Sequence, residues 1–138
     1  MAPVALEKNG LASALHELTQ SLCKVFAVGC TFEARSNIAI NDVFAATHLY
    51  RIAQEAMTNA LKHGQATKIK VTLDRMGDEA ILRIKDNGCG FSQTTATEAQ
   101  GMGLRSIRYR AGMVPAYLQI ESRLNRGTTI TCTFPTTL

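Results

Sequence analysis

Residues 42–63 carry the pattern that most limits how this chain can fold. Their apolar residues recur at three- and four-residue steps and fill one broad arc of a helical wheel, which predicts an amphipathic helix with one buried face. Asn41 or Asp42 is suited to cap the start of this helix, and Gly64 is suited to end it. The apolar arc comprises Leu49, Ile52, Ala53, Ala56, Met57, Ala60 and Leu61. Such a helix must lie against another layer, and the rest of the chain predicts a sheet.

Shorter patterns on either side predict the remaining elements. Leucine and valine residues at helical spacing predict a helix over residues 10–27, and another is expected from about Gly103 to Met113. The expected strands are 30–34, 68–73, 81–86, 117–123 and 128–134, with hairpin turns at Met76–Glu79 and Asn125–Gly127. We therefore predict an α+β fold of two layers, in which a mixed, mostly antiparallel sheet of about five strands is covered on one face by about three helices.

Composition is that of one ordinary globular domain. The hydrophobic fraction is 46% and the charged fraction is 19%. Neither a repeat nor a linker is visible, so we expect a single domain over residues 1–138, with residues 1–9 flexible or left over from cloning. No run approaches the roughly 18–20 apolar residues of a membrane span, and no signal peptide is recognisable. We expect a cytoplasmic segment without direct membrane contact.

The charge and the cysteines bound the function further. The net charge of +4 could indicate nucleic acid, but the basic residues are scattered and no aromatic residues lie among them to stack on bases. We expect no nucleic-acid partner, and a positive field that suits an anionic nucleotide. No two cysteines form a Cys-x-x-Cys pair, so we expect free thiols in a reducing cytosol. The four are Cys23, Cys30, Cys89 and Cys132.

Three short stretches indicate a nucleotide site. On the long helix, Glu55, Asn59 and Lys62 lie within about 60° of one another, and a carboxylate with an amide suits a hydrated Mg²⁺. The loop at 86–91 contains an acid and two glycines, and glycine lets a backbone approach a ligand closely. The glycines at 101–104 precede a predicted helix, whose free N–H groups can bind phosphate. Alone, each stretch could be a solvated helix face or a turn; their order and spacing favour the site.

These stretches resemble the ATP site of the GHKL superfamily, which includes gyrase-type topoisomerases, certain chaperones, mismatch-repair ATPases and histidine kinases. Within it, the chain is similar to the catalytic and ATP-binding domain of bacterial two-component sensor histidine kinases, in the branch of nitrate/nitrite and degradative-enzyme sensors. The N box of that branch is matched by residues 49–63, which read Leu-Tyr-Arg-Ile-Ala-Gln-Glu-Ala-Met-Thr-Asn-Ala-Leu-Lys-His. Residues 103–111 and 127–129 follow its pattern as well, whereas Val114-Pro115-Ala116 replaces its usual Gly-Gly pair. The similarity spans about residues 28–135.

The resemblance implies the Bergerat ATP-binding fold, with ATP and Mg²⁺ as cofactors. It implies that Asn59 binds Mg²⁺ and that Glu55 orients a water on the ion or acts as a general base. It implies that Lys62 contacts the phosphates. His63 would be mainly structural, with a role beside the phosphates as the alternative.

For the glycine-rich stretches, the resemblance implies contacts to the base and the phosphates. Asp86 would accept a hydrogen bond from the exocyclic amine of adenine, and Thr128 would add a hydroxyl near Asp86. Gly88 and Gly90 would let the loop lie against the base. Residues 92–100 would form a hinged lid over ATP. The phosphates would then be led to the next helix by Gly101, Met102, Gly103 and Leu104.

The implied reaction is transfer of the γ-phosphoryl group of ATP to a histidine on a separate helical dimerisation domain. His16-Glu17 faintly resembles an acceptor dipeptide, but the residues between His16 and Glu55 cannot hold a two-helix hairpin as well as a strand and a connector. We therefore expect the acceptor domain to be absent from this chain, and the isolated domain to autophosphorylate poorly or not at all. The implied partners are that acceptor domain and a response regulator, in a homodimeric full-length protein.

Two alternatives remain open from the sequence. The first is a GHKL serine kinase or switch protein of the anti-sigma type, which acts on a separate protein. The second is a module that binds a nucleotide without catalysis. Intact Glu55, Asn59 and Asp86 argue against the second alternative.

Overall fold

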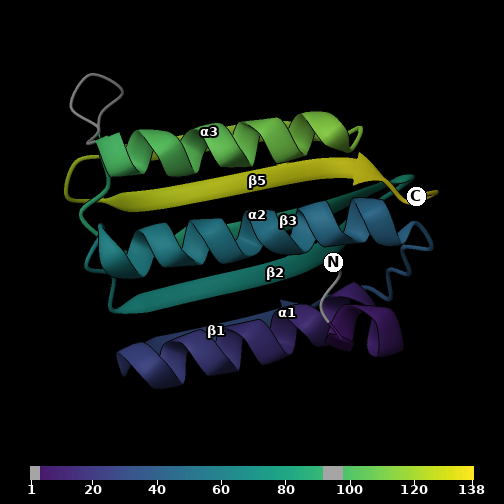
Figure 1. The fold of residues 1–138 in the computed structure, drawn as a ribbon, viewed down its shortest axis with the longest axis horizontal. Coiled ribbons are helices and arrows are strands. Elements are labelled where there is room, and N and C mark those ends of the chain that lie inside the picture. The colour runs from purple at the N-terminus through teal and green to yellow at the C-terminus, as the bar shows by residue number, and fades with distance from the viewer. Residues whose placement is uncertain (1–3, 92–97) are drawn as a thin grey trace.

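Three helices and five strands make up the described part of the chain (Figure 1). The computed structural model describes residues 4–91 and 98–138, with only the backbone at 4–9, 98–100 and 102. In chain order the elements are α1 (Val4–Phe26), β1 (Gly29–Ala34), α2 (Val43–Lys62), β2 (Lys68–Met76), β3 (Glu79–Asp86), α3 (Glu98–Met113), β4 (Tyr117–Arg123) and β5 (Gly127–Pro135). All three helices lie on one face of the sheet (Figure 1), which confirms the predicted α+β architecture.

The sheet is mixed, with the strand order β1-β2-β3-β5-β4. β1 pairs with β2 in parallel, and the three other pairings are antiparallel. The β2–β3 hairpin turns at Gly77, whose φ of 61° is a conformation that glycine adopts readily. Because β3 and β5 are antiparallel neighbours, the C-terminal end of β3 lies beside the N-terminal end of β5. Both segments therefore reach the same end of the sheet.

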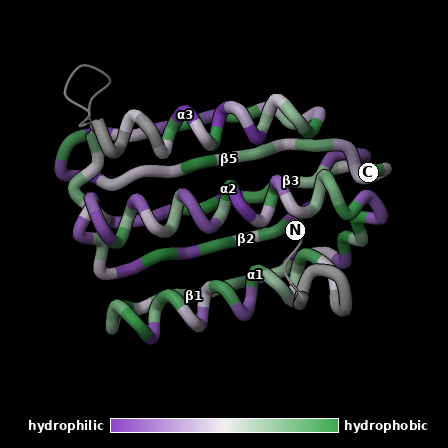
Figure 2. Tube along the Cα trace, viewed as in Figure 1, coloured by the Kyte–Doolittle hydropathy of each residue, from purple (hydrophilic) through white to green (hydrophobic). Residues whose placement is uncertain are grey.

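α2 is the central helix and forms as the sequence predicts. The Asp42 carboxylate caps it by accepting hydrogen bonds from the N–H groups of Phe44 and Ala45 at 3.0 and 3.2 Å. Hydrophobic and hydrophilic residues alternate along its turns (Figure 2). Its apolar arc is buried, and Leu49, Ile52 and Met57 have no exposed surface. This face packs on inward-facing residues of the sheet and of the other helices, among them Val71, Leu73, Leu82, Ile84, Ile107 and Phe134.

Two helices differ from their predicted bounds. α1 extends to Val4, beyond a break in helical geometry at Gly10. α3 begins at Glu98 rather than near Gly103, so Gly101 and Gly103 lie inside its first two turns. The lid predicted at 92–100 therefore falls partly on the helix, and its residues 92–97 lie outside the described ones. A glycine inside a helix weakens it but does not prevent it from forming. The start of α3 was therefore placed too late when the glycine pair was read as a helix boundary.

The expectation of four free thiols is wrong for one pair. Cys23 near the end of α1 and Cys30 in β1 form a disulfide, with their Cα atoms 5.9 Å apart. Ala27, at φ 55°, turns the chain between them and brings the strand back against the helix. Two cysteines seven positions apart match no recognisable cysteine motif. Their contact depends on the turn at Ala27. Cys89 and Cys132 are free.

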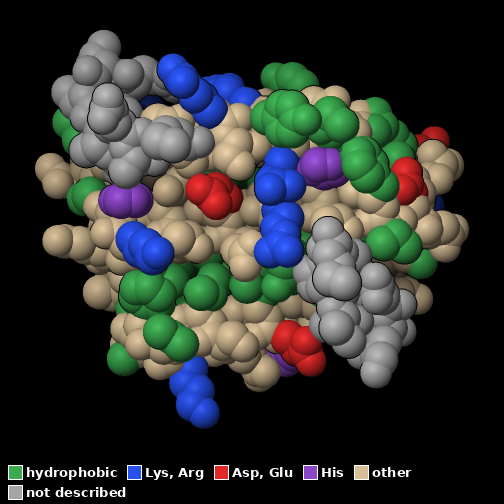
Figure 3. Space-filling view, viewed as in Figure 1, with side chains coloured by type: hydrophobic (Ala, Val, Ile, Leu, Met, Phe, Trp, Pro, Cys, Tyr) green, Lys and Arg blue, Asp and Glu red, His purple; other side chains and the backbone are tan. Residues whose placement is uncertain are grey.

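The helix-covered surface is not uniformly polar. Figure 3 shows hydrophobic side chains gathered over the C-terminal half of α3, where Tyr109 and Met113 are exposed. Among the described residues, no helix has both the length and the apolar character that crossing a membrane would require.

Candidate nucleotide-binding site

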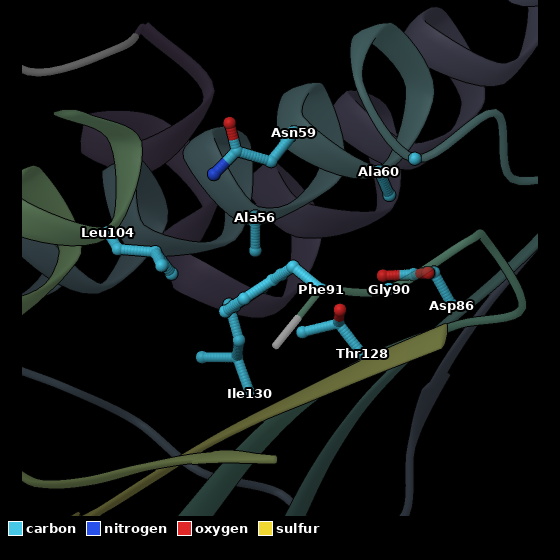
Figure 4. Close-up of a pocket in the computed structure, with 10 residues that line it drawn as sticks. Ala56, Asn59, Ala60, Asp86, Gly90, Phe91, Leu104, Thr128 and Ile130 are labelled. Carbon is cyan, nitrogen blue, oxygen red and sulfur yellow. The ribbon is translucent and has the colours of Figure 1, made fainter. Parts of the chain in front are cut away.

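A pocket lies between α2 and the edge of the sheet where β3 ends and β5 begins (Figure 4). It is lined by Ala56, Asn59, Ala60, Gly64, Asp86, Gly90, Phe91, Leu104, Thr128 and Ile130. Its open volume is about 20 Å³, which is room for roughly one water. Figure 4 shows Phe91 between Ala56 of α2 and Ile130 of β5. Phe91 therefore occupies part of the space between α2 and β5.

Asn59 faces this pocket from α2 and lies against Gly103 of α3. A Cβ atom at Gly103 would be 2.5 Å from Asn59 Nδ2 and 2.8 Å from its Oδ1, closer than side chains tolerate. The missing side chain at Gly103 therefore leaves Asn59 the room that it occupies. This contact joins the predicted metal-binding residue to the predicted phosphate-binding stretch.

Asp86 ends β3 and enters the pocket from the opposite side. Its Oδ1 accepts a hydrogen bond from the N–H of Gly88 at 2.8 Å. Burial raises the pKa of the carboxyl group, and the backbone N–H groups of Gly88 and Thr128 oppose that shift in part. Among the described residues, the causes that act on the pKa of Asp86 are burial and two backbone hydrogen bonds, with no cation among them. Such a half-buried carboxylate is suited to accept a hydrogen bond from a neutral donor on a ligand.

The glycine loop is held in place by backbone contacts from distant segments. The Cys89 N–H donates to Gly64 O at 2.7 Å, and the Asn125 N–H donates to Cys89 O at 2.5 Å. Gly90 has a φ of 60°, and a Cβ there would overlap the Arg123 carbonyl. Only glycine fits this position, because the β4–β5 turn presses directly on the loop.

Asn87 fastens the loop on its other side. Its Oδ1 accepts hydrogen bonds from the N–H groups of Thr67 and Lys68, both at 2.9 Å, and its Nδ2 donates to Thr67 Oγ1 at 2.9 Å. The loop between Asp86 and Phe91 is thus fixed to the start of β2 as well as to the β4–β5 turn.

The structure brings together five of the predicted site residues as pocket lining: Asn59, Asp86, Gly90, Leu104 and Thr128. Gly88 is buried beside them and bonds Asp86, and Gly103 touches Asn59. Glu55 is partly buried on α2 one turn before Asn59, whereas Lys62 and His63 are exposed at the C-terminal end of α2. Gly101 lies in α3 outside the lining, and the side chain of Met102 lies outside the described part.

Several lining residues were missed from the sequence. Ala56 and Ala60 were assigned to the core, and Phe91, although part of the loop motif, was given no role. Each is apolar, and apolar residues form most of the lining of small-molecule sites. The helical spacing of Ala56 and Ala60 around Asn59 was the signal that could have identified them.

The donor set fits a nucleotide with a metal held through its phosphates. Among the described residues, no group of three His, Cys, Asp or Glu side chains could hold a metal by itself. Mg²⁺ differs from metals that need such a cage, since one or two protein oxygens together with phosphate and water complete its shell. The Glu55 carboxylate and the Asn59 amide, one helical turn apart on α2, are the groups that could supply such oxygens.

Comparisons with known proteins show the family and the fold of the chain. A family model described as "Histidine kinase-, DNA gyrase B-, and HSP90-like ATPase" matches residues 45–138. The oxygen sensor histidine kinase NreB of Staphylococcus carnosus is 29% identical over 137 residues, which are 99% of this chain and 40% of NreB. The chain thus spans less than half the length of this relative.

Two solved structures share the fold at low sequence identity. The ATP binding domain of PrrB from Mycobacterium tuberculosis has a TM-score of 0.75 at 17% identity, covering 91% of this chain and 93% of that one. The histidine kinase domain of the Erythrobacter litoralis EL346 blue-light activated kinase has a TM-score of 0.71 at 20% identity, covering 91% and 60%.

Proposed function

Since this chain belongs to the histidine kinase-, DNA gyrase B- and HSP90-like ATPase family, we propose that it is the ATP-binding catalytic domain of a sensor histidine kinase. It transfers the γ-phosphoryl group of ATP to a histidine on a dimerisation domain outside this chain. The observation that carries the proposal is the meeting of Asn59 and Asp86 at one pocket, although 27 positions separate them in the sequence. The similarity to NreB favours this function over the serine-kinase and non-catalytic alternatives.

Asp86 selects the base. Its carboxylate accepts a hydrogen bond from the exocyclic amine of adenine, and the Gly88 N–H holds the carboxylate in position. Guanine carries an acceptor oxygen where adenine carries that amine, so the carboxylate repels it. The glycine loop lies beside the base, with Phe91 displaced from the pocket centre.

Asn59 and Glu55 act at the phosphate end. The Asn59 amide oxygen binds Mg²⁺, which when bound neutralises and orients the phosphates. Glu55 holds a water or accepts a proton beside it. Lys62, exposed at the end of α2, adds positive charge for the phosphates.

The partners and the location are also part of this proposal. The chain acts with its own acceptor domain in a homodimer and then passes the phosphoryl group to a response regulator. It forms part of the cytoplasmic portion of the sensor.

Thermal unfolding with and without Mg·ATP tests the function. A ligand at 100 times its Kd stabilises the native state by about 2.7 kcal/mol, or roughly 5–15 °C for a domain of this size. Mg·GTP at the same concentration is the control and should shift the melting temperature far less. No shift with millimolar Mg·ATP would contradict the proposal.

Phosphoryl transfer needs a second experiment. The acceptor hairpin is supplied as a separate chain, and acid-labile phosphohistidine is measured. Phosphoserine on a bound partner, detected by mass spectrometry, would instead indicate the anti-sigma type of kinase.

A further inference from the structure

Asn87 and Gly88 place an Asn-Gly pair in the middle of the glycine loop. Asparagine is among the residues that are chemically lost with time and heat. The loss is fastest when glycine follows, because glycine has no side chain to hinder ring closure onto the asparagine. The Asn87 side chain is exposed to water in the folded chain. Its contacts in the loop therefore decide whether this reaction runs in the native state.

The reaction takes place within the chain and consumes only water. The backbone nitrogen of Gly88 loses its proton and attacks Cγ of Asn87. A C–N bond forms and closes a succinimide ring, while the bond from Cγ to the side-chain nitrogen breaks and ammonia leaves. Water then opens the ring at one of its two carbonyl groups, which gives aspartate or isoaspartate at this position.

The native loop restrains both reacting groups. Asn87 Oδ1 accepts hydrogen bonds from the N–H groups of Thr67 and Lys68, and Asn87 Nδ2 donates to Thr67 Oγ1, all at 2.9 Å. An amide fixed by three hydrogen bonds does not rotate freely to present its carbon to the neighbouring nitrogen. The Gly88 N–H donates to Asp86 Oδ1 at 2.8 Å, which stabilises the proton that must leave. The fold therefore slows the reaction at both partners.

The two products fit this loop differently. An aspartate at position 87 can accept hydrogen bonds from the two N–H groups and, in reversed sense, from the Thr67 hydroxyl. Isoaspartate instead inserts an extra methylene group into the backbone just before Gly88. Gly88 is buried, and even a Cβ there would lie 2.6 Å from Gly64 O. The lengthened backbone has no room in the native arrangement.

We propose that Asn87-Gly88 is a deamidation site that the fold protects, and that it reacts when the glycine loop detaches from the start of β2. Isoaspartate then prevents the loop from closing again, so nucleotide binding is lost irreversibly. The deamidation itself is independent of the proposed function, and only the loss of ATP binding rests on it.

Peptide mapping by mass spectrometry at neutral pH measures the reaction in the folded parent and in guanidinium chloride. Deamidation of Asn87 should be at least about 10-fold slower in the folded chain, because it requires local opening of the loop. Asn9 is also followed by glycine. In denaturant the two asparagines should react within about threefold of each other, because local sequence dominates the rate in an unfolded chain.

A pair of threonine variants tests the restraint. Thr67→Val removes the acceptor of the Asn87 Nδ2 hydrogen bond and should speed deamidation in the folded chain by about 3- to 10-fold, the range of one hydrogen bond. Thr136→Val is the matched control, because its hydroxyl bonds Asp78 O at the start of β3, whereas Asn87 follows the end of β3. It should react like the parent. Equal rates in folded and unfolded parent, or equal rates in the two variants, would overturn the inference.

Calorimetry with Mg·ATP measures the consequence. The isoaspartate form, separated after ageing in denaturant and refolding, should lose measurable binding. Asn87→Asp, which is the other product made directly and carries the same added charge, should bind Mg·ATP more tightly than the isoaspartate form. Equal binding by these two forms would overturn the claim that the lengthened backbone causes the loss. If the undamaged parent fails to bind Mg·ATP while Asn87 deamidates in the expected pattern, the proposed function fails and the deamidation site stands.

Discussion

Replacement of Asp86 by asparagine should separate nucleotide recognition from folding. The amide oxygen of asparagine can keep the 2.8 Å hydrogen bond from the Gly88 N–H. Its NH₂ group then faces the base and presents a donor to the exocyclic amine of adenine, which is itself a donor. The reversed amide offers an acceptor to the base but breaks the bond to Gly88. In either orientation one hydrogen bond is lost.

Asp86→Asn should change ATP affinity and the free energy of unfolding differently. A hydrogen bond to a charged group contributes about 1.5–3 kcal/mol, so Asp86→Asn should weaken ATP binding by about 10- to 150-fold. Burial raises the pKa of Asp86 in the folded domain, which means that its ionised form disfavours folding at neutral pH. The neutral amide removes that penalty. The free energy of unfolding without nucleotide should therefore stay level or rise.

Calorimetry with ATP measures the affinity, and urea unfolding at pH 7 measures the stability. Asp74→Asn is the matched control, because Asp74 lies in β2 away from the pocket and pairs with Arg35 at 3.7 Å. This control should bind ATP like the parent. ATP binding by Asp86→Asn within twofold of the parent would refute the adenine contact. A large loss of unfolding free energy in Asp86→Asn would refute the separation of the two effects.

Three further outcomes test the phosphate end and the titration of the site. Asn59→Ala should make ATP affinity nearly independent of Mg²⁺, measured by calorimetry with and without the ion, and full Mg²⁺ dependence would contradict this role. Glu55→Ala should bind Mg·ATP nearly normally but fail to form phosphohistidine on a separately supplied acceptor. Phosphoryl transfer by Glu55→Ala at the parental rate would contradict the role of Glu55. Gly103→Ala should weaken Mg·ATP binding several-fold, because the new Cβ would lie 2.5 Å from Asn59 Nδ2. Unchanged affinity would show that Asn59 has room to move. Gly112→Ala on the same helix is the control, because a Cβ at Gly112 would have no atom within 4 Å. Burial raises the pKa of Asp86 above its ordinary value of 3.8, so its contribution to the unfolding free energy is greatest below pH 3.8 and declines as pH rises through the folded pKa. ATP affinity should instead fall as pH drops through the folded pKa. The parent should show both trends relative to Asp86→Asn, and parallel pH profiles of the two proteins would argue against them.

Local signals in the sequence predicted the fold well. The Asp42 cap and the apolar arc fixed α2, and Gly77 fixed the β2–β3 hairpin. Gly64 was predicted as the glycine that stops the helix. The left-handed residue is instead Gln65, at φ 52°, while Gly64 O accepts the Cys89 N–H. The helix ends at Lys62, directly before His63 and Gly64, and the close approach of the glycine loop to Gly64 depends on Gly88, whose Cβ would lie 2.6 Å from Gly64 O. No local pattern reveals this contact.

The sequence identified the candidate site residues whose functional groups could bind a metal or a base. It missed residues whose contribution is only a contact set by the fold. Asn59 and Asp86 are recognisable because an amide and an acid suit a metal and an amine. Ser122 is a serine in an alternating strand. Its bond to Thr128 depends on the β4–β5 register, and its bond to the Phe91 N–H depends on the glycine loop lying beside β4. Such contacts can be recognised only once the strands are paired.

The seating of the β4–β5 turn on the glycine loop has a consequence for the order of folding. Cys89 O accepts a hydrogen bond from the Asn125 N–H, and the Arg123 carbonyl packs directly on Gly90. The loop therefore reaches its final shape after the C-terminal hairpin has docked. Chain closure over such separations is slow relative to local helix formation. Nucleotide binding is therefore acquired late, by the complete chain. Conversely, bound nucleotide should slow amide hydrogen exchange in β4, a strand that contributes no residue to the pocket lining, because opening of that strand would release the loop.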